Sequence, residues 1–202
     1  MCCILRAQDA QEQGMLKNIL QVSNFSKLIT FSLLLSTLLL STIAGISSSY
    51  ASCNTDHFDL SAKVKSIHDG DTIRLETDEK LRLIGINTPE LGHDGQKPQP
   101  YSWEAKKQLT QLLHQHNNQV KLRYDVQKKD KYYRLLAHLY LNNGVSISEW
   151  LLEKGLATVL TVPPNIWQLS CYKAAEKRAQ VAKLGIWSLP SYQPIESSTL
   201  KN

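Results

Sequence analysis

The sequence predicts an α+β fold, mainly β, in which five short strands form a small closed barrel that carries three helices. Short apolar or alternating segments separated by turn residues are typical of strands, and five such segments are present. Three of the five come before the first helical pattern, and two helical patterns follow the last strand. Short strands with helices inserted late favour a barrel that carries helices.

Turn residues separate the expected strands. Residues 58–67 alternate loosely between apolar and polar side chains, and Asp69-Gly70-Asp71 marks the turn that follows them. The third strand is ended by Asn87-Thr88-Pro89. The expected strands are residues 58–67, 72–75, 81–86, 120–124 and 135–141.

The three expected helices carry start and stop signals. The hydroxyls of Ser102 and Ser146 can accept hydrogen bonds from the free backbone N–H groups at the start of the first two helices, which begin near residues 103 and 147. Gly155 stands in the usual position after the second helix, and Gly185 stops the third, residues 167–183. This order is compatible with the oligonucleotide-binding barrel and also with other α+β folds.

The beginning of the chain has the composition of an export signal. Residues 28–46 carry no charge, follow Lys17 and Lys27, and precede a run of small residues that includes Ser49-Tyr50-Ala51. We therefore expect residues 1–51 to be a signal peptide, residues 52–190 the folded domain, and residues 191–202 a polar tail. The protein would then be secreted or periplasmic. The alternative is an uncleaved membrane anchor, because nineteen uncharged residues are long enough to span a bilayer.

Removal of the signal would change the net charge little and would leave two cysteines. Lys and Arg outnumber Asp and Glu by 23 to 18, and the +5 excess falls to +4 because residues 1–51 hold three basic and two acidic side chains. A mild positive charge fits a polyanionic partner without identifying one. Cys53 and Cys171 remain, and an oxidising compartment would allow them to form a disulfide. The alternative of a lipidated Cys53 is disfavoured by Tyr50, where such signals usually have leucine.

Oxygen-bearing side chains lie at the ends of two expected strands. Asp71 opens one strand after Asp69, while Asn87 and Glu90 close another. If these strand ends are neighbours, their carboxylate and amide oxygens converge, which is the ligand set of a hard cation such as calcium. The alternative is that both groups belong only to turns.

Two arginines enter or lie within apolar strands. Arg82 is inside the third strand, and Arg134 enters the fifth after the polar run 128–133. A guanidinium in such a place needs a partner, and its planar fork can hold phosphate oxygens at two points. The alternative is structural ion pairing, in which Arg82 forms an ion pair with Asp71 or Glu90.

Five motifs in order resemble the staphylococcal nuclease family over about residues 60–188. The motifs are Ile67-His68-Asp69-Gly70-Asp71-Thr72, Arg82-Leu83-Ile84-Gly85-Ile86-Asn87-Thr88-Pro89-Glu90, Asp130-Lys131-Tyr132-Tyr133-Arg134, Gly155-Leu156-Ala157 and Leu184-Gly185-Ile186-Trp187-Ser188. The resemblance implies a five-stranded oligonucleotide-binding barrel with three helices. It also implies cleavage of DNA and RNA to products with 3′-phosphate ends.

The resemblance further implies a metal site and a base. One Ca²⁺ would be bound by Asp71, Asn87 and the carbonyl oxygen of Thr88, and Glu90 would be the general base that activates or orients the attacking water.

Four other residues would hold the substrate. Arg82 and Arg134 would grip the phosphate and stabilise the five-coordinate transition state, while Lys131 and Tyr132 would bind substrate.

The chain departs from the family pattern at three places. Asn87 stands where the family has an aspartate ligand, so one negative charge is missing. Thr161 stands about where the family has a nucleotide-contacting tyrosine, and the loop after it is short. Tyr133 replaces a glycine before Arg134. These departures bear on metal affinity, base stacking and substrate preference.

The function expected from these residues is an exported, calcium-dependent nuclease with DNA and RNA as its substrates. It would act as a monomer without a stable protein partner, and it would meet a membrane only if the signal stayed uncleaved. The alternative is a non-catalytic nucleic-acid-binding barrel. The presence of Asp71, Arg82, Glu90 and Arg134 together favours the enzyme.

Overall fold

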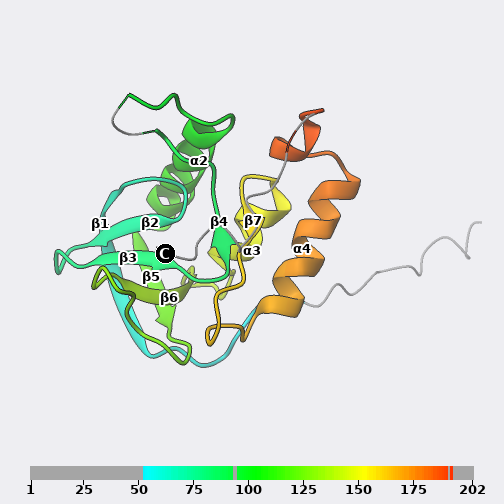
Figure 1. Cartoon of the computed structure of the whole chain (residues 1–202). Helices are drawn as coiled ribbons and strands as arrows, with labels where there is room; N and C mark the ends of the chain where they lie inside the picture. Colours follow the sequence, from blue (N-terminus) through cyan, green and yellow to red (C-terminus); the bar gives the residue numbers. More distant parts are fainter. Residues whose placement is uncertain (1–51, 93–94, 191, 193–202) are drawn as a thin grey trace, which may run out of the picture. The chain divides into compact units, whose positions relative to one another are not determined.

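The computed structural model describes residues 52–92, 95–190 and 192 (Figure 1). The predicted signal peptide and the predicted tail, apart from residue 192, lie outside the described residues. Within the described part of the chain, no helix is both long and apolar enough to cross a bilayer. Export, cleavage and anchoring therefore stay predictions.

Five strands close a barrel in the order β1–β2–β3–β6–β5, and β1 pairs with β5 to complete it. The strands are β1 (Leu60–Ile67), β2 (Thr72–Leu75), β3 (Lys80–Leu83), β5 (Gln119–Arg123) and β6 (Leu135–Tyr140). All neighbours are antiparallel except β3 and β6, which are parallel. The predicted α+β, mainly β, barrel is confirmed.

Alternation along the strands fills the barrel interior. In β5, for example, Val120 and Leu122 are buried while Gln119 is exposed. Leu109 and Leu113 of α2 (Ser102–Gln115) belong to the same core. In Figure 1, α2 lies at one end of the barrel, and α3 (Ile147–Glu153) and α4 (Leu169–Val181) lie together beside it. Burial of these apolar side chains is the main favourable contribution to folding.

The third expected strand is divided, which corrects the predicted span of residues 81–86. Pairing within the barrel stops at Leu83, and β4 (Ile86–Asn87) pairs instead with β7 (Thr158–Val159) in a separate two-stranded sheet. Gly85 between them has a φ of 83°, and a Cβ there would lie 2.7 Å from the ring of Tyr172. Only glycine fits this bend, after which the chain leaves the barrel ladder and pairs with β7.

The helix starts match the sequence at one of two positions. Ser146 accepts a hydrogen bond from the backbone N–H of Glu149 at 3.3 Å and begins α3 as predicted. Ser102 was predicted to begin the first helix in the same way, and this is wrong. The residue before α2 is Tyr101 in a left-handed conformation, and the Ser102 hydroxyl donates to the carbonyl of Gln99 at 2.7 Å.

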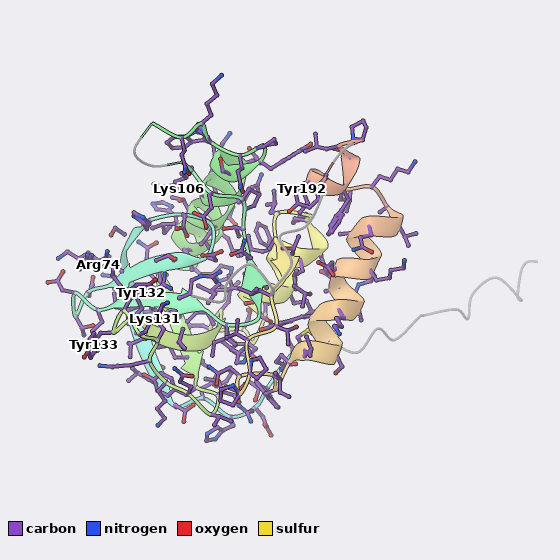
Figure 2. All side chains as sticks on the ribbon, viewed as in Figure 1. Arg74, Lys106, Lys131, Tyr132, Tyr133 and Tyr192 are labelled. Atoms are coloured by element: carbon purple, nitrogen blue, oxygen red, sulfur yellow. A yellow bond between two sulfur atoms is a disulfide. The ribbon has the colours of Figure 1, made fainter. Side chains whose placement is uncertain are left out.

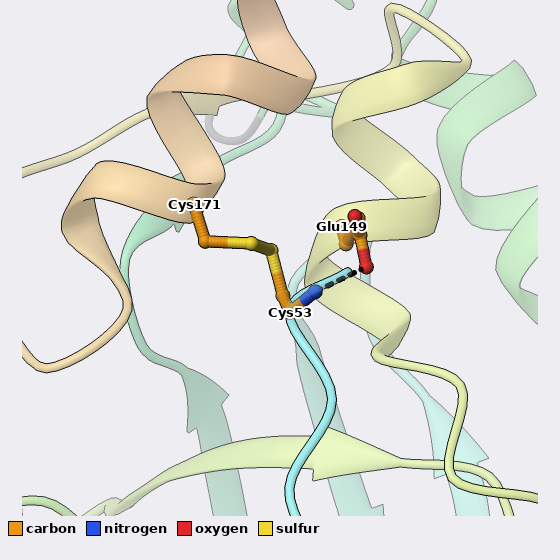
Figure 3. Close-up of side chains that lie close together, drawn as sticks. All are labelled: Cys53, Glu149 and Cys171. Atoms are coloured by element: carbon orange, nitrogen blue, oxygen red, sulfur yellow. Dashed lines mark hydrogen bonds between the residues drawn. A yellow bond between two sulfur atoms is a disulfide. The ribbon is translucent and has the colours of Figure 1, made fainter. Parts of the chain in front are cut away.

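The structure joins Cys53 and Cys171 by a disulfide, whose Cα atoms are 5.6 Å apart (Figure 3). The bridge ties the segment before β1 to α4. Glu149 of α3 lies beside it and accepts a hydrogen bond from the backbone N–H of Cys53 at 2.9 Å. The sulfurs and this carboxylate lie within 4.8 Å of one another, but metals bind thiolates, and both sulfurs are in the disulfide.

Candidate active site

A cleft of about 620 Å³ opens on one side of the barrel. Its walls come from the β1–β2 turn, from β3 and β4, and from the segments around residues 127–136 and 160–165. Of the eight residues predicted to bind metal or substrate or to act in catalysis, seven line it: Asp71, Arg82, Asn87, Glu90, Lys131, Tyr132 and Arg134. The eighth, Thr88, is buried and is hydrogen-bonded to Asp71.

Asp71 connects the two strand ends that must be neighbours if their oxygen atoms are to converge. Its Oδ2 accepts hydrogen bonds from the backbone N–H of Thr88 at 2.7 Å and from the Thr88 hydroxyl at 3.0 Å. A Cβ at Gly70 would come within 2.7 Å of the Thr88 side chain, so this close approach needs glycine. Asp69 shapes the turn, because its Oδ1 accepts from the N–H groups of Asp71 and Thr72 at 3.0 and 2.6 Å.

Arg82 connects Asp71 to Asn87. Its Nε lies 3.0 Å from Asp71 Oδ1, and its Nη2 donates to Asn87 Oδ1 at 2.9 Å. Its Nη1 donates to the carbonyl oxygen of Leu83 at 2.7 Å. The ion pair between Arg82 and Asp71, one of the alternatives from the sequence, is therefore present in the structure. It also places the guanidinium at the cleft, where Arg82 is one of the lining residues.

Burial raises the pKa of Asp71 above its usual range, although the charge of Arg82 beside it acts in the opposite direction. The nearby carboxylate of Asp69 adds to the rise. Two acidic side chains therefore lie close together in a partly desolvated place with one guanidinium as their cationic neighbour. A second cation at this position would favour the ionised form of Asp71.

Arg134 is positioned by a tight turn built on Asp130. The Oδ2 of Asp130 accepts from Arg134 Nε at 2.6 Å, and its Oδ1 accepts from the backbone N–H groups of Tyr132 and Arg134 at 2.9 and 3.0 Å. Burial raises the pKa of Asp130, but these hydrogen bonds outweigh it and hold the pKa below its usual range. Arg134 Cζ and Lys131 Nζ lie 5.5 and 5.4 Å from the centre of the Tyr132 ring.

Glu90 is exposed at the edge of the cleft and is held through its backbone. Its N–H donates to Gln99 Oε1, and its carbonyl accepts from the N–H of Gln99, both at 2.9 Å. The side chain is therefore accessible to solvent while the main chain that carries it is fixed. A general base needs both properties.

Comparison with known proteins identifies the family. The model of the family described as staphylococcal nuclease homologue matches residues 80–189. The chain belongs to this family. The thermonuclease of Staphylococcus hyicus is 39% identical over 133 residues, which cover 62% of this chain and 75% of that protein. The thermonuclease of Staphylococcus intermedius is 39% identical over 131 residues, or 61% and 74% of the two chains. Endonuclease YncB of Bacillus subtilis is 36% identical over 129 residues, or 61% and 60%.

The family match covers the cleft residues from Lys80 onward but begins after Asp71. The link between Asp71 and the matched region is therefore a property of the three-dimensional structure, through Thr88 and Arg82.

Oxygen atoms in and next to the cleft fit a hard divalent cation. They are the carboxylate of Asp71 and Oδ1 of Asn87, which line the cleft, and the carbonyl of the adjoining buried residue Thr88, which accepts a long hydrogen bond of 3.4 Å from Asn87 Nδ2. Calcium is bound in proteins by such a set of carboxylate, amide and carbonyl oxygens. The fit is of chemical type, with Arg82 holding two of the three donors by hydrogen bond or ion pair.

One wall of the cleft depends on a residue that the sequence did not single out. Asn165 is buried, and its Oδ1 accepts from the backbone N–H of Gln127 at 2.7 Å while its Nδ2 donates to the carbonyl of Gln127 at 2.8 Å. This pair of bonds fastens the 160–165 segment to the chain that leads into the Asp130 turn. Asn165 follows two prolines in a loop, where periodicity carries no signal for such a contact.

Proposed function

We propose that this chain is an exported, calcium-dependent nuclease that cuts DNA and RNA and leaves 3′-phosphate ends. Its relatives are named thermonuclease and endonuclease, and the chain is accordingly a nuclease, a hydrolase of phosphodiester bonds in nucleic acids. Calcium, export, the product ends and a monomeric state are the proposed parts.

One observation carries the proposal. A single cleft brings together an exposed carboxylate, two guanidiniums and the oxygens of Asp71 and Asn87. Hydrolysis of a phosphodiester needs these functions: a base for water, cationic donors for the phosphate and a place for a hard metal ion.

The residues divide the reaction between them. Glu90 takes a proton from the attacking water as the new oxygen–phosphorus bond forms. Arg82 and Arg134 donate hydrogen bonds to the non-bridging oxygens, where negative charge increases in the five-coordinate transition state. The bond to the 5′-oxygen breaks, this oxygen takes up a proton from water to leave as a hydroxyl group, and the phosphate stays on the 3′-oxygen. Bound at Asp71, Asn87 and Thr88, calcium would supply Lewis-acid stabilisation of that charge.

Digestion of plasmid DNA and of RNA tests this proposal. Residues 52–202 are incubated with calcium or with a chelator, and the product ends are treated with a phosphatase that removes 3′-phosphates. We expect cleavage only with calcium and phosphatase-sensitive ends. Equal cleavage in chelator would reject the calcium requirement, and phosphatase-resistant ends would reject the product assignment.

A non-catalytic binding barrel is the second candidate, since Arg82 already forms an ion pair with Asp71 and could be purely structural. The two candidates differ in one result. A binding protein retains oligonucleotide affinity but releases no product at any calcium concentration.

A further inference from the structure

Tyr133 is unusually exposed for an aromatic side chain. Its exposed fraction is 85%, the highest among the large exposed hydrophobic side chains of the described residues. Its two neighbours, Tyr132 and Arg134, line the cleft, whereas Tyr133 is not among the lining residues. Tyr133 therefore lies between two cleft residues in the chain while its own side chain extends into solvent. In Figure 2 it projects from the same side of the barrel as Lys131 and Tyr132, away from Lys106 and Tyr192.

The backbone of Tyr133 is in an unfavourable conformation. Its φ is 61°, in the left-handed region where a side chain is disfavoured and glycine is not. The turn is nevertheless well held, because the N–H of Tyr133 donates to the carbonyl of Asp130 at 3.0 Å. The carboxylate of Asp130 binds Arg134 on the other side. Asp130 thus fixes both the backbone of Tyr133 and the orientation of the Arg134 guanidinium.

The segment that carries this ring is rich in cations. Lys131 and Arg134 flank Tyr133 in the chain and lie over the ring of Tyr132, and Lys128 and Lys129 precede the turn. A phosphate held by Arg134 would leave the base of an adjoining nucleotide near the cleft rim. Every unpaired base has a flat face that can stack on an aromatic ring, whereas paired bases in a duplex are already stacked.

We propose that Tyr133 is a stacking site for an unpaired nucleobase of a nucleic acid bound in this cleft. The proposal rests on the proposed nuclease function for the identity of the ligand. It accounts for an exposed ring on a backbone that glycine would suit better. The same ring is fixed to the arginine that would hold the neighbouring phosphate.

Binding measured without cleavage tests the stacking site. Fluorescence anisotropy in chelator follows three labelled probes of equal length: a single strand, a single strand with abasic sites in place of its bases, and a duplex. We expect Tyr133→Gly to weaken binding of the base-bearing single strand by about tenfold, the usual effect of losing one stacked base. Binding of the abasic and duplex probes should stay the same, because their phosphates are still held.

Two variants serve as controls. Tyr133→Phe keeps the ring and should bind the single strand like the parent chain. Trp103→Ala removes an exposed ring on α2 that does not line the cleft, and it should change none of the three affinities. Tyr133→Gly should also unfold at an equal or higher temperature, because glycine suits a φ of 61°.

The outcomes separate this proposal from the nuclease proposal. Unchanged single-strand affinity in Tyr133→Gly, equal losses on all three probes, or no measurable binding by the parent chain would each reject the stacking site. Failure of the parent chain to cleave any substrate with calcium would reject the nuclease proposal alone, since the binding comparison does not use cleavage.

Discussion

At the residue scale, Asn87 is where the proposed metal site departs from the family pattern. Its amide oxygen can coordinate a cation but brings no negative charge, and in the structure it accepts a hydrogen bond from Arg82 at 2.9 Å. Asp71 is the one carboxylate of the proposed ligand set. Asp69 beside it accepts hydrogen bonds from backbone N–H groups of the turn. Because ligand charge tunes calcium affinity, this site should bind calcium weakly.

We predict that Asn87→Asp lowers the calcium concentration needed for half-maximal activity and leaves the maximal rate similar. The added charge strengthens metal binding and does not touch the proton transfer by Glu90. Calcium titrations of nuclease activity measure both quantities. If Asn87→Asp has no effect while Asp69→Asn raises the half-saturating calcium, Asp69 rather than Asn87 is the ligand.

Glu90→Gln and Arg82→Ala should each lower turnover by at least about a hundredfold, the scale for loss of a general base or a charge stabiliser. The two variants should differ in stability. Glu90 is exposed, so Glu90→Gln should unfold like the parent chain. Arg82→Ala leaves the buried Asp71 without its ion-pair partner and should cost on the order of 3 kcal/mol in calcium-free buffer.

Turnover of folded protein and thermal unfolding are measured on the same samples. Glu153→Gln changes an exposed acidic residue that is paired with Arg178 and does not line the cleft, and it is the control for general charge effects. Near-normal cleavage by Glu90→Gln or by Arg82→Ala would disprove the mechanism.

At the scale of elements, β6 and α4 are held together by a buried polar contact. His138 of β6 is 1% exposed, its Nδ1 lies 2.9 Å from the hydroxyl of Tyr172 in α4, and its ring packs edge-on against Trp167. Burial lowers the pKa of His138 from 6.5 to about 4, although the carboxylate of Asp125, 3.8 Å from Nε2, acts in the opposite direction. The charge of Arg123 contributes to the lowering. The neutral imidazole is therefore the form compatible with this packing.

We predict a loss of stability as the pH falls from about 6.5 to about 4. The unfolded chain binds a proton at His138 over this range and the folded chain does not, so acid favours unfolding. The full effect is roughly 3 kcal/mol. Urea unfolding at several pH values measures it, and His138→Gln is the control because it removes the titrating group. The same pH dependence in parent chain and variant would contradict the assignment.

At the scale of the whole molecule, the disulfide links the two ends of the folded domain. Cys53 precedes the first strand, and Cys171 lies in the last α-helix, 118 residues later. A cross-link between distant residues limits the freedom of the unfolded chain. The segment before β1 is also held by Glu149, which accepts a hydrogen bond from Cys53.

We predict that the exported protein contains this disulfide and that Cys53→Ser with Cys171→Ser lowers the free energy of unfolding by about 2–5 kcal/mol. The cleft residues are separate from the bridge, so turnover at low temperature should change little. Mass spectrometry of the unreduced protein provides the direct check. Two free thiols, or lipid attached to Cys53, would refute the prediction.

The sequence predicts which residues form the site, but it does not predict the contacts between them. Asp71, Arg82, Asn87, Glu90 and Arg134 were identified from motif and strand position, and the cleft brings all of them together. The cap at Ser102 was predicted wrongly, because local propensity does not include the contact that the Ser102 hydroxyl makes with Gln99.

Periodicity, turn residues and short motifs are enough to predict the five barrel strands, the three helices, the family resemblance and the set of chemical groups. Only the packed structure shows that the third strand divides at Gly85, where the ring of Tyr172 lies against the backbone, and that β4 then pairs with β7. It also decided that Asn165 fastens the cleft wall and that Arg82 bridges Asp71 and Asn87. Most of these contacts join residues far apart in the chain, and their geometry follows from how the elements pack rather than from any local pattern.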